Sequence, residues 1–256
     1  MSDASRETAQ QFSRQARAYA ESPSHALGSD LQIVADFAQA TPDDLCLDIA
    51  TGPGHTAFRI AERAGFVVGG DIAQGMLAAA KDLAVQHAVS NVAFVLCDVH
   101  CLPFAADCFD LVTCRIAPHH FQALPAALAD VRRILKSGGR FVLEDSLAPD
   151  EPAAAVFLEA LETRRDATHV HTLSRDEWTA ALEDAGLATA RETVFAKTHD
   201  FDLWIRRTGL PDGAVREIEA DILASPAAVR DRLFDIEGDR VTTLRDRKLI
   251  VRAEKS

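Results

Sequence analysis

The feature that most constrains the fold of this sequence is an alternation of short apolar runs with segments of helical spacing. Five runs have the length and composition of strands that are buried on both faces of a sheet. They lie at residues 45–50, 66–71, 91–98, 109–117 and 140–147. Several segments between them carry apolar residues at intervals of three and four. The alternation predicts an α/β doubly wound fold, in which right-handed crossovers place helices on both faces of a mostly parallel sheet.

The pattern changes after residue 150. A helix is predicted to open at Pro152, because proline is favoured in the first turn of a helix. Another helix begins with a capping box formed by Ser174 and Glu177 and ends at Gly186. Two further apolar segments complete a predicted seven-stranded sheet, at residues 188–201 and 247–254.

The segment between these two late strands is too long for a simple hairpin and reads as helical. We interpret it as an inserted helical lid over about residues 200–240, with a plain packing subdomain as the alternative. We therefore expect a ligand-binding core with an N-terminal helical cover, residues 1–147, and a C-terminal part, residues 148–256, that completes the sheet.

Charge and apolarity exclude several classes of protein. Hydrophobic residues make up 48% of the chain and charged residues 26%, which is typical of a globular protein. The net charge of -12, without a basic run, opposes nucleic-acid binding. No apolar run reaches the roughly 18 residues of a membrane span, and the N-terminus lacks the apolar region of a secretory signal. We therefore expect a cytoplasmic enzyme that does not bind nucleic acid and has no membrane span.

The cysteines raise a metal-site hypothesis. The chain has five: Cys46, Cys97, Cys101, Cys108 and Cys114. An odd number without an export signal indicates reduced thiols. Four of them lie near His100, His119 and His120, but their spacing lacks the paired C-x2-C knuckles of structural zinc sites. We expect buried free thiols and no metal.

The segment "LDIATGPGHTA", residues 47–57, is a strand that passes into a glycine turn. Gly52 and Gly54 allow the backbone to approach a ligand closely, since neither carries a Cβ. With Ala57 the spacing matches G-x-G-x-x-G/A, so a dinucleotide is permitted. NAD, FAD, a nucleoside phosphate and S-adenosylmethionine are all candidate ligands at this stage.

Asp48 favours a cationic ligand at this turn. Its carboxylate lies near the end of the strand and would repel a pyrophosphate, which prefers helix N-termini and bare amides. It would suit the amine and sulfonium of S-adenosylmethionine. The alternative is that Asp48 only braces the turn through backbone amides.

Two more acidic residues end the next strands. Asp71 can accept hydrogen bonds from the two ribose hydroxyls, which fits NAD and S-adenosylmethionine equally and excludes NADP. Asp98 can accept from the exocyclic amine of adenine, while the amide of Val99 donates to a ring nitrogen. The alternative for Asp71 is an exposed aspartate at a strand end. Together with Asp48, these carboxylates describe a site for an adenosine with a cationic tail.

The sequence resembles the class I S-adenosylmethionine-dependent methyltransferases, in particular the branch of the ubiquinone/menaquinone C-methyltransferases. The matching stretches are "LDIATGPGHTA", "GGDIAQGMLAAA", "VLCDVHCLPFAADCFDLVTCRIAPHHF" and "ALADVRRILKSGGRFVLED". They follow the order of the family and cover about residues 40–146. Ser137 replaces the usual proline of one loop. The resemblance implies a Rossmann-like fold, the cofactor S-adenosyl-L-methionine and methyl transfer to a C-, O- or N-nucleophile of a small molecule.

The resemblance also assigns residues to the cofactor. It implies that the methionine portion is contacted by Asp48, Ala50, Gly52 and Gly54, and that the ribose is bound by Asp71. Ile72 and Met76 would contact the face of the adenine ring, while Asp98 and Val99 would bind its edge. Arg115 would offer its backbone carbonyl to the amino group. Tyr19, in a segment similar to Phe-x-x-x-A-x-x-Tyr of the family, would close over the cofactor or serve packing.

His119 and His120 follow the fourth strand and are the candidate catalytic residues. Imidazole can accept a proton near neutral pH, although a role in orienting the cofactor or supporting the loop is an alternative. Glu144 and Asp145 are weaker candidates for the acceptor pocket. Apolar side chains of the C-terminal part suit either a hydrophobic acceptor or a core: Phe157, Trp178, Trp204, Ile205 and Leu210.

Three other functions stay open at this stage. A relative of the family can bind the cofactor and catalyse a reaction without methyl transfer, or act as a binding protein. An NAD-dependent oxidoreductase is disfavoured, because the chain's single tyrosine is not part of the Tyr-x-x-x-Lys pair of short-chain dehydrogenases.

Overall fold

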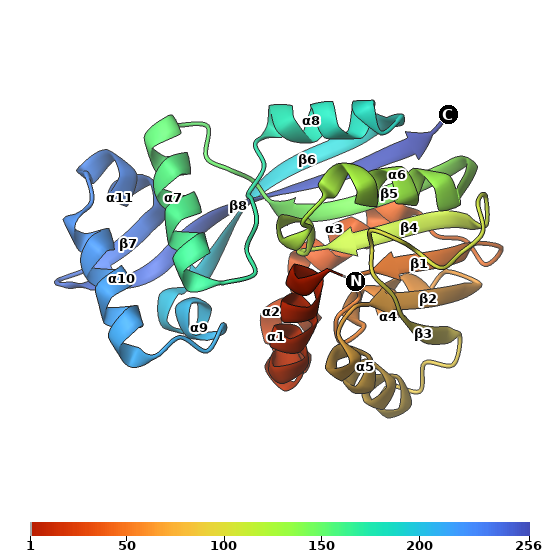
Figure 1. Ribbon diagram of the computed structural model, residues 1–256, viewed down its shortest axis with the longest axis horizontal. Coiled ribbons are helices and arrows are strands. Elements are labelled where there is room, and N and C mark those ends of the chain that lie inside the picture. The colour runs from red at the N-terminus through yellow and green to blue at the C-terminus, as the bar shows by residue number, and fades with distance from the viewer. Residues whose placement is uncertain (1) are drawn as a thin grey trace.

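The computed structural model describes residues 2–256, apart from the side chain of Ser24, and shows a central sheet with helices on both of its faces (Figure 1). The strands are β1 (Leu45–Ile49), β2 (Phe66–Asp71), β3 (Val92–Leu96), β4 (Phe109–Arg115), β5 (Leu135–Ser146), β6 (Leu187–Asp200), β7 (Phe234–Glu237) and β8 (Arg240–Lys255). The first six helices are α1 (Asp3–Ala20), α2 (Pro23–Ala26), α3 (Ser29–Ala38), α4 (His55–Ala61), α5 (Gln74–Gln86) and the 3-10 helix η1 (Pro118–His120). The others are α6 (Leu124–Ile134), α7 (Pro152–Arg165), α8 (Arg175–Asp184), α9 (Phe201–Arg206), α10 (Asp212–Ala224) and α11 (Ala227–Leu233).

The strand order is β3-β2-β1-β4-β5-β8-β6. The pairs from β3 to β5 are parallel, and β8 pairs antiparallel with both β5 and β6. This order reverses direction at β1, which is the switch point of a doubly wound sheet. The predicted α/β doubly wound fold with a mostly parallel sheet is confirmed.

The structure adds one short strand to the seven that were predicted. β7 pairs antiparallel with the start of β8 through a turn at Gly238, where φ is +63°. The sequence pattern predicts a helix and no strand before this turn, because a four-residue strand carries too few side chains to show a period of two. β8 is also longer than predicted and begins at Arg240.

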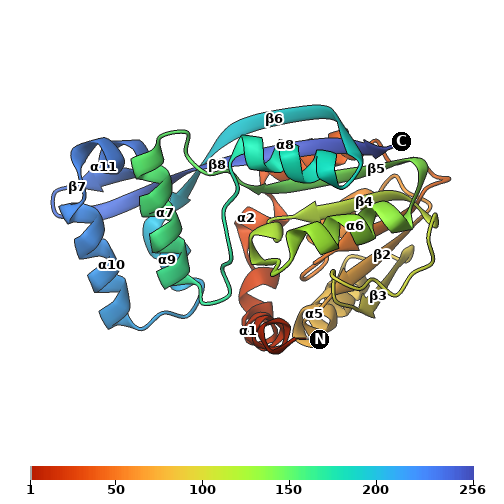
Figure 2. The ribbon, with the colours of Figure 1, turned by 45° about the horizontal axis from the view of Figure 1, so that its top comes forward.

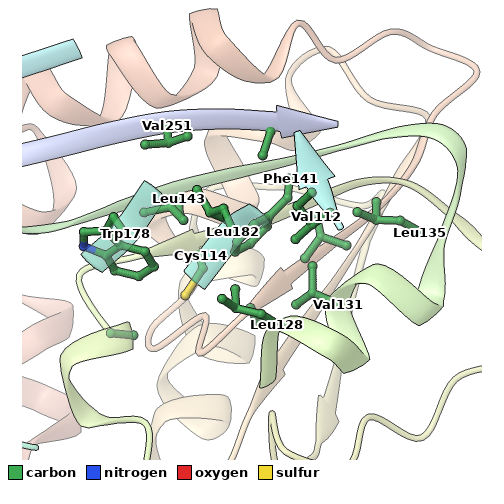
Figure 3. Close-up of a cluster of buried hydrophobic side chains, with 14 of the residues drawn as sticks. Val112, Cys114, Leu128, Val131, Leu135, Phe141, Leu143, Trp178, Leu182 and Val251 are labelled. Atoms are coloured by element: carbon green, nitrogen blue, oxygen red, sulfur yellow. The ribbon is translucent and has the colours of Figure 1, made fainter. Parts of the chain in front are cut away.

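Two apolar cores hold the sheet between its helices. On one face, α6 and α8 cover the strands from β4 to β6, and Figure 3 shows Trp178 and Leu182 of α8 pointing toward Leu143 and Val251 of the strands. On the other face, α3 and α4 pack against the sheet around Val34. The predicted capping box is present at the start of α8.

A third core lies at the far end of the two long strands. In Figures 1 and 2, helices α7, α9, α10 and α11 gather with β7 on one side of the molecule, where β6 and β8 extend beyond the rest of the sheet. Trp204 and Ile205 are buried in this core, and Phe157 and Leu210 pack against it. Phe157, Ile205 and Leu210 therefore serve packing, and Trp204 both packs in this core and lines a pocket described below.

The five cysteines are free thiols, and Cys46 and Cys114 are buried. Across the described part of the chain, no group of three or more His, Cys, Asp or Glu side chains is arranged to hold a metal ion. No helix among residues 2–256 is long and apolar enough to cross a membrane.

We expect Leu143→Ala to lower the free energy of unfolding by about 2–5 kcal/mol, because it leaves a cavity in a fully buried core. The matched control is Leu203→Ala, because Leu203 is 72% exposed. This control should change the free energy of unfolding by no more than about 0.5 kcal/mol. Urea unfolding of both variants measures the difference. Equal losses in the two variants would contradict the assigned core.

Candidate active site

A cavity opens at the edge of the sheet where the parallel strands β1, β2 and β4 end. It holds about 1030 Å³ of empty space, its open mouth included. The turn after β1, the end of β2, the segment after β3, the end of β4 and one face of α1 form its wall. Because ligands of doubly wound folds bind at this edge, we call it the cofactor cavity.

Most of the residues that the resemblance assigns to the cofactor meet in this cavity. Its lining includes Tyr19, Ala50, Gly52, Asp71, Ile72, Met76, Asp98, Val99 and Arg115. His120 lines it as well. Asp48, Gly54 and His119 lie outside the lining that the described residues form.

Backbone strain is concentrated at the cavity. Ala50 and Ile116 both line it, and their φ angles are +50° and +54°. A left-handed conformation costs an L-residue roughly 1–2 kcal/mol, and it is rarest for a β-branched residue such as isoleucine. Strain of this kind is found at functional sites, where the surrounding structure holds it in place.

The glycine turn leaves room for a ligand. Gly52 has a φ of +55°, and apart from its chain neighbours no heavy atom of the described residues lies within 4 Å of a Cβ built there. Gly54 has a φ of +92°, and a Cβ there would come within 2.7 Å of the Phe58 ring. Glycine at position 54 therefore avoids a clash with the Phe58 ring of helix α4. Glycine at position 52 instead faces the cavity.

Asp71 fixes this turn. Its Oδ2 accepts from the amide of Gly52 at 2.8 Å, and its Oδ1 accepts from the amide of Ala73 at 2.8 Å. Burial raises the pKa of this carboxyl to about 6. Each oxygen keeps a lone pair for a ligand hydroxyl.

Asp48 lies beneath the turn, with 1% of its surface exposed. Its two oxygens accept from the hydroxyls of Thr51 and Thr113, each at 2.6 Å. Burial raises the pKa of this carboxyl to about 6. In this structure Asp48 braces the turn against β4 through threonine hydroxyls, and not through the backbone amides considered above.

Asp98 and Arg115 are held by neighbours. The Oδ1 of Asp98 is 2.6 Å from the Nδ1 of His100. Burial raises the pKa of Asp98, but hydrogen bonds from His100 outweigh it and lower the pKa below the ordinary value. The guanidinium of Arg115 donates to Asp30 at 2.7 Å, to the carbonyl of His25 at 2.6 Å and to Thr56 at 3.0 Å.

A second, smaller pocket adjoins the cofactor cavity and holds about 640 Å³ of empty space. The two share four lining residues, which we call the border: Tyr19, His25, Ile116 and His120. The rest of the second pocket comes mainly from α7 and the segment after it, from α9 and from β6 and β8. The two spaces therefore lie on either side of the border.

His119 lines the second pocket and forms a dyad with Asp145, the penultimate residue of β5. The Nδ1 of His119 lies 2.6 Å from Asp145 Oδ1, and its amide donates to Asp145 Oδ2 at 2.8 Å. Burial lowers the pKa of His119, but the carboxylate of Asp145 outweighs burial and raises it above the ordinary value. Because an ionised carboxylate only accepts, Nδ1 carries the proton and the lone pair is at Nε2.

His120 is oriented differently. Its ring lies 4.1 Å from the ring of His119, and its Nδ1 is 3.0 Å from the carbonyl of Thr168, to which it donates. Burial and the charge of His119 lower the pKa of His120 to about 3. His120 is therefore neutral at physiological pH, with Nε2 free to accept a hydrogen bond.

The segment after α7 was not recognised from the sequence as part of the site. The Oδ1 of Asp166 accepts from Thr168 and from Gln11 of α1, both at 2.7 Å. The amide of Val170 donates to the carbonyl of His119 at 2.8 Å. These contacts hold both histidines in place, and no local period in the sequence predicts them.

Glu144 does not line the second pocket. It is fully buried, and neither of its carboxylate oxygens has a hydrogen-bond partner among the described residues. Burial raises the pKa of this carboxyl to about 8, so it is largely neutral. Of the two acidic residues at the end of β5, Asp145 is the one that contacts a histidine of the site.

Comparison with known proteins identifies a family. Residues 41–186 match the family model of the methyltransferase domain. An uncharacterized methyltransferase of Bacillus subtilis, YcgJ, is 33% identical over 86% of this chain and 87% of its own. The crystal structure of a putative methyltransferase from Bacillus halodurans superposes with a TM-score of 0.86 at 30% identity, over 89% of this chain and 99% of that one.

A more local similarity concerns the ubiquinone/menaquinone branch. The C-methyltransferase UbiE of Xanthomonas oryzae is 40% identical over 107 residues, which are 40% of this chain and 42% of that protein. The resemblance stated from the motifs is confirmed.

We expect Asp145→Asn to lower the pKa of His119, because burial remains while the negative charge that opposes it is removed. Titration of the histidine Cε1 protons by NMR measures the shift. His171, which pairs with Glu159 and Glu177 at the surface, should keep its pKa and serves as the internal control. An unchanged pKa of His119 would refute the dyad.

Proposed function

This chain belongs to the methyltransferase domain family, and we propose that it transfers a methyl group from S-adenosyl-L-methionine to a small-molecule acceptor. The observation that carries this proposal is the charge of the cofactor cavity. Arg115 is the one Lys or Arg among its described lining residues, and its guanidinium is already paired with Asp30 at 2.7 Å. The cavity therefore presents carboxylates, which repel a pyrophosphate, without a free Lys or Arg to offset them.

The residues present fit this cofactor. Gly52 opens onto the cavity, so the backbone admits a bulky ligand beside it. Asp71 keeps acceptor capacity for ribose hydroxyls, and Asp98 lines the cavity just after β3. Ile72 and Met76 offer apolar surface for a purine ring. When bound, S-adenosylmethionine supplies an electrophilic methyl group on a sulfonium.

The division of the chain follows from the two spaces. We propose that residues 1–147 hold the cofactor, because the described lining residues of the cofactor cavity all lie between Ser5 and Gln122. We propose that the acceptor binds in the second pocket, where residues 148–256 supply most of the wall. In this proposal α9 belongs to the lid over the acceptor.

His119 is the proposed general base. Its Nε2 carries the lone pair, and Asp145 stabilises the protonated ring. The acceptor loses its proton to Nε2 while its nucleophilic atom bonds to the methyl carbon and the carbon–sulfur bond breaks. His120, with its low pKa, is a poor base and instead shapes the border between the two ligands.

We expect S-adenosylhomocysteine to bind the purified chain and NAD not to bind. Asp71→Ala should weaken S-adenosylhomocysteine binding by about tenfold or more, since it removes charged hydrogen-bond acceptors from the turn and the ribose. Asp82→Ala, an exposed change of the same charge on α5, is the control. Calorimetric titration reports all four arms. Binding of NAD, or equal affinity in both variants, would overturn the assignment of the cavity.

We expect the rate of methyl transfer to fall as the pH drops through the pKa of His119, because the base must be unprotonated. That midpoint lies above the ordinary histidine value of about 6.5. Asp145→Asn should move it to lower pH, and His119→Gln should lower kcat by about 10²–10⁴-fold.

The assay follows labelled methyl transfer to an acceptor found by screening, with His171→Gln as the surface control. A pH profile that is unchanged in Asp145→Asn would exclude His119 as the base.

A further inference from the structure

The second pocket contains an arginine whose guanidinium has no partner among the described residues. Arg207 follows α9 and is partly buried. Its guanidinium makes no hydrogen bond or ion pair with any part of the chain that the structure describes. Burial lowers the pKa of Arg207, and the carboxylate that acts on it, Glu162, is already paired with Arg165 at 2.9 Å. A charge that is taken out of water without a partner carries a desolvation cost.

The other cations of the pocket each contact an acid. Lys248 pairs with Asp246 at 2.6 Å. Lys197 shares Asp30 with Arg115, at 2.9 Å and 2.7 Å. A further acid of the pocket wall, Asp166, is bound by Gln11 and Thr168. Among the described cations of this wall, Arg207 is therefore the one without an acid within ion-pair distance.

The position of Arg207 separates it from the cofactor. It lines the second pocket but not the cofactor cavity, as judged over the described residues. Arg165 lines the same pocket and is oriented by Glu162 and by the Trp204 ring at 4.3 Å. His119 lines this pocket from η1. A ligand that contacts both Arg207 and His119 would lie within the pocket.

Resting on the proposed function, we infer that the methyl acceptor carries an oxyanion, a carboxylate or a phosphate, that binds the guanidinium of Arg207. A guanidinium donates two parallel hydrogen bonds to such a group, which fixes its orientation. With the oxyanion at Arg207, the nucleophilic atom of the acceptor lies toward His119 and the border.

The wall of the pocket supports an anionic acceptor over an apolar one. Polar and charged side chains form most of this wall, with Ile116 and Trp204 as the aliphatic and indole side chains among them. Phe157, Ile205 and Leu210, which could have received a hydrophobic acceptor, belong to the third core and do not line the pocket. The chemistry available to a ligand here is therefore charge and hydrogen bonding.

The test uses small probes of defined charge. Benzoate, phenyl phosphate and neutral benzyl alcohol are titrated by calorimetry into the full chain loaded with S-adenosylhomocysteine. We expect one or both anions to bind and benzyl alcohol not to bind. Preference for benzoate indicates a carboxylate acceptor, and preference for phenyl phosphate indicates a phosphate ester.

Arg207→Gln should weaken anion binding by about tenfold or more. The matched control is Arg206→Gln, which removes the same charge from the neighbouring residue, an exposed arginine paired with Asp202 and Asp212. Arg207→Lys should give an intermediate affinity, because it keeps the charge and loses the planar fork. Unchanged S-adenosylhomocysteine affinity shows that each variant is folded.

The outcomes separate this inference from the proposed function. Three results overturn the inference while cofactor binding stands: no anion binding to wild type, equal anion affinity in Arg207→Gln and wild type, or binding of benzyl alcohol as tightly as the anions. If wild type does not bind S-adenosylhomocysteine, the proposed function fails. If wild type then binds the anions without binding S-adenosylhomocysteine, the pocket is an anion site that has no role in binding a methyl acceptor. That result also overturns the inference.

Discussion

The hydrogen bond from the amide of Gly52 to the carboxylate of Asp71 is the interaction on which the site depends. It joins the turn after β1 to the end of β2 at 2.8 Å and holds Gly52 at a positive φ. Asp48 connects the strand before the same turn to β4, because its carboxylate accepts a hydrogen bond from the Thr113 hydroxyl. Two buried carboxylates thus shape a loop that local backbone preference would not form, because Ala50 is also left-handed there. This loop forms one wall of the cofactor cavity.

The second space depends on contacts between distant parts of the chain. Asp145 orients His119, and the segment after α7 binds the backbone of His119 and the ring of His120. These contacts give two adjacent histidines opposite behaviour, with the pKa of one raised and that of the other lowered to about 3. The long strands β6 and β8 extend to α9 (Figure 1). Arg207, which follows α9, lines the same pocket as His119.

Local patterns predicted the parts of the molecule that local sequence determines. The alternation of apolar runs with helical segments predicted the parallel strands, and the glycine turn after Asp48 and the acidic strand end at Asp71 are likewise local signals. β7 was missed because it has four residues, and the early part of β8 because charged residues interrupt its apolar pattern. Arg207 could not be assigned from sequence, since its role depends on which acids are already paired in three dimensions.

A crystal structure of the complex with S-adenosylhomocysteine tests the central claim most directly. The account predicts the ribose hydroxyls on the carboxylate of Asp71 and the sulfur directed at the border formed by Tyr19, His25, Ile116 and His120. Methyl transfer across the border into the second pocket requires that orientation. A ligand whose sulfur points away from the second pocket, or whose ribose lies elsewhere, would contradict it.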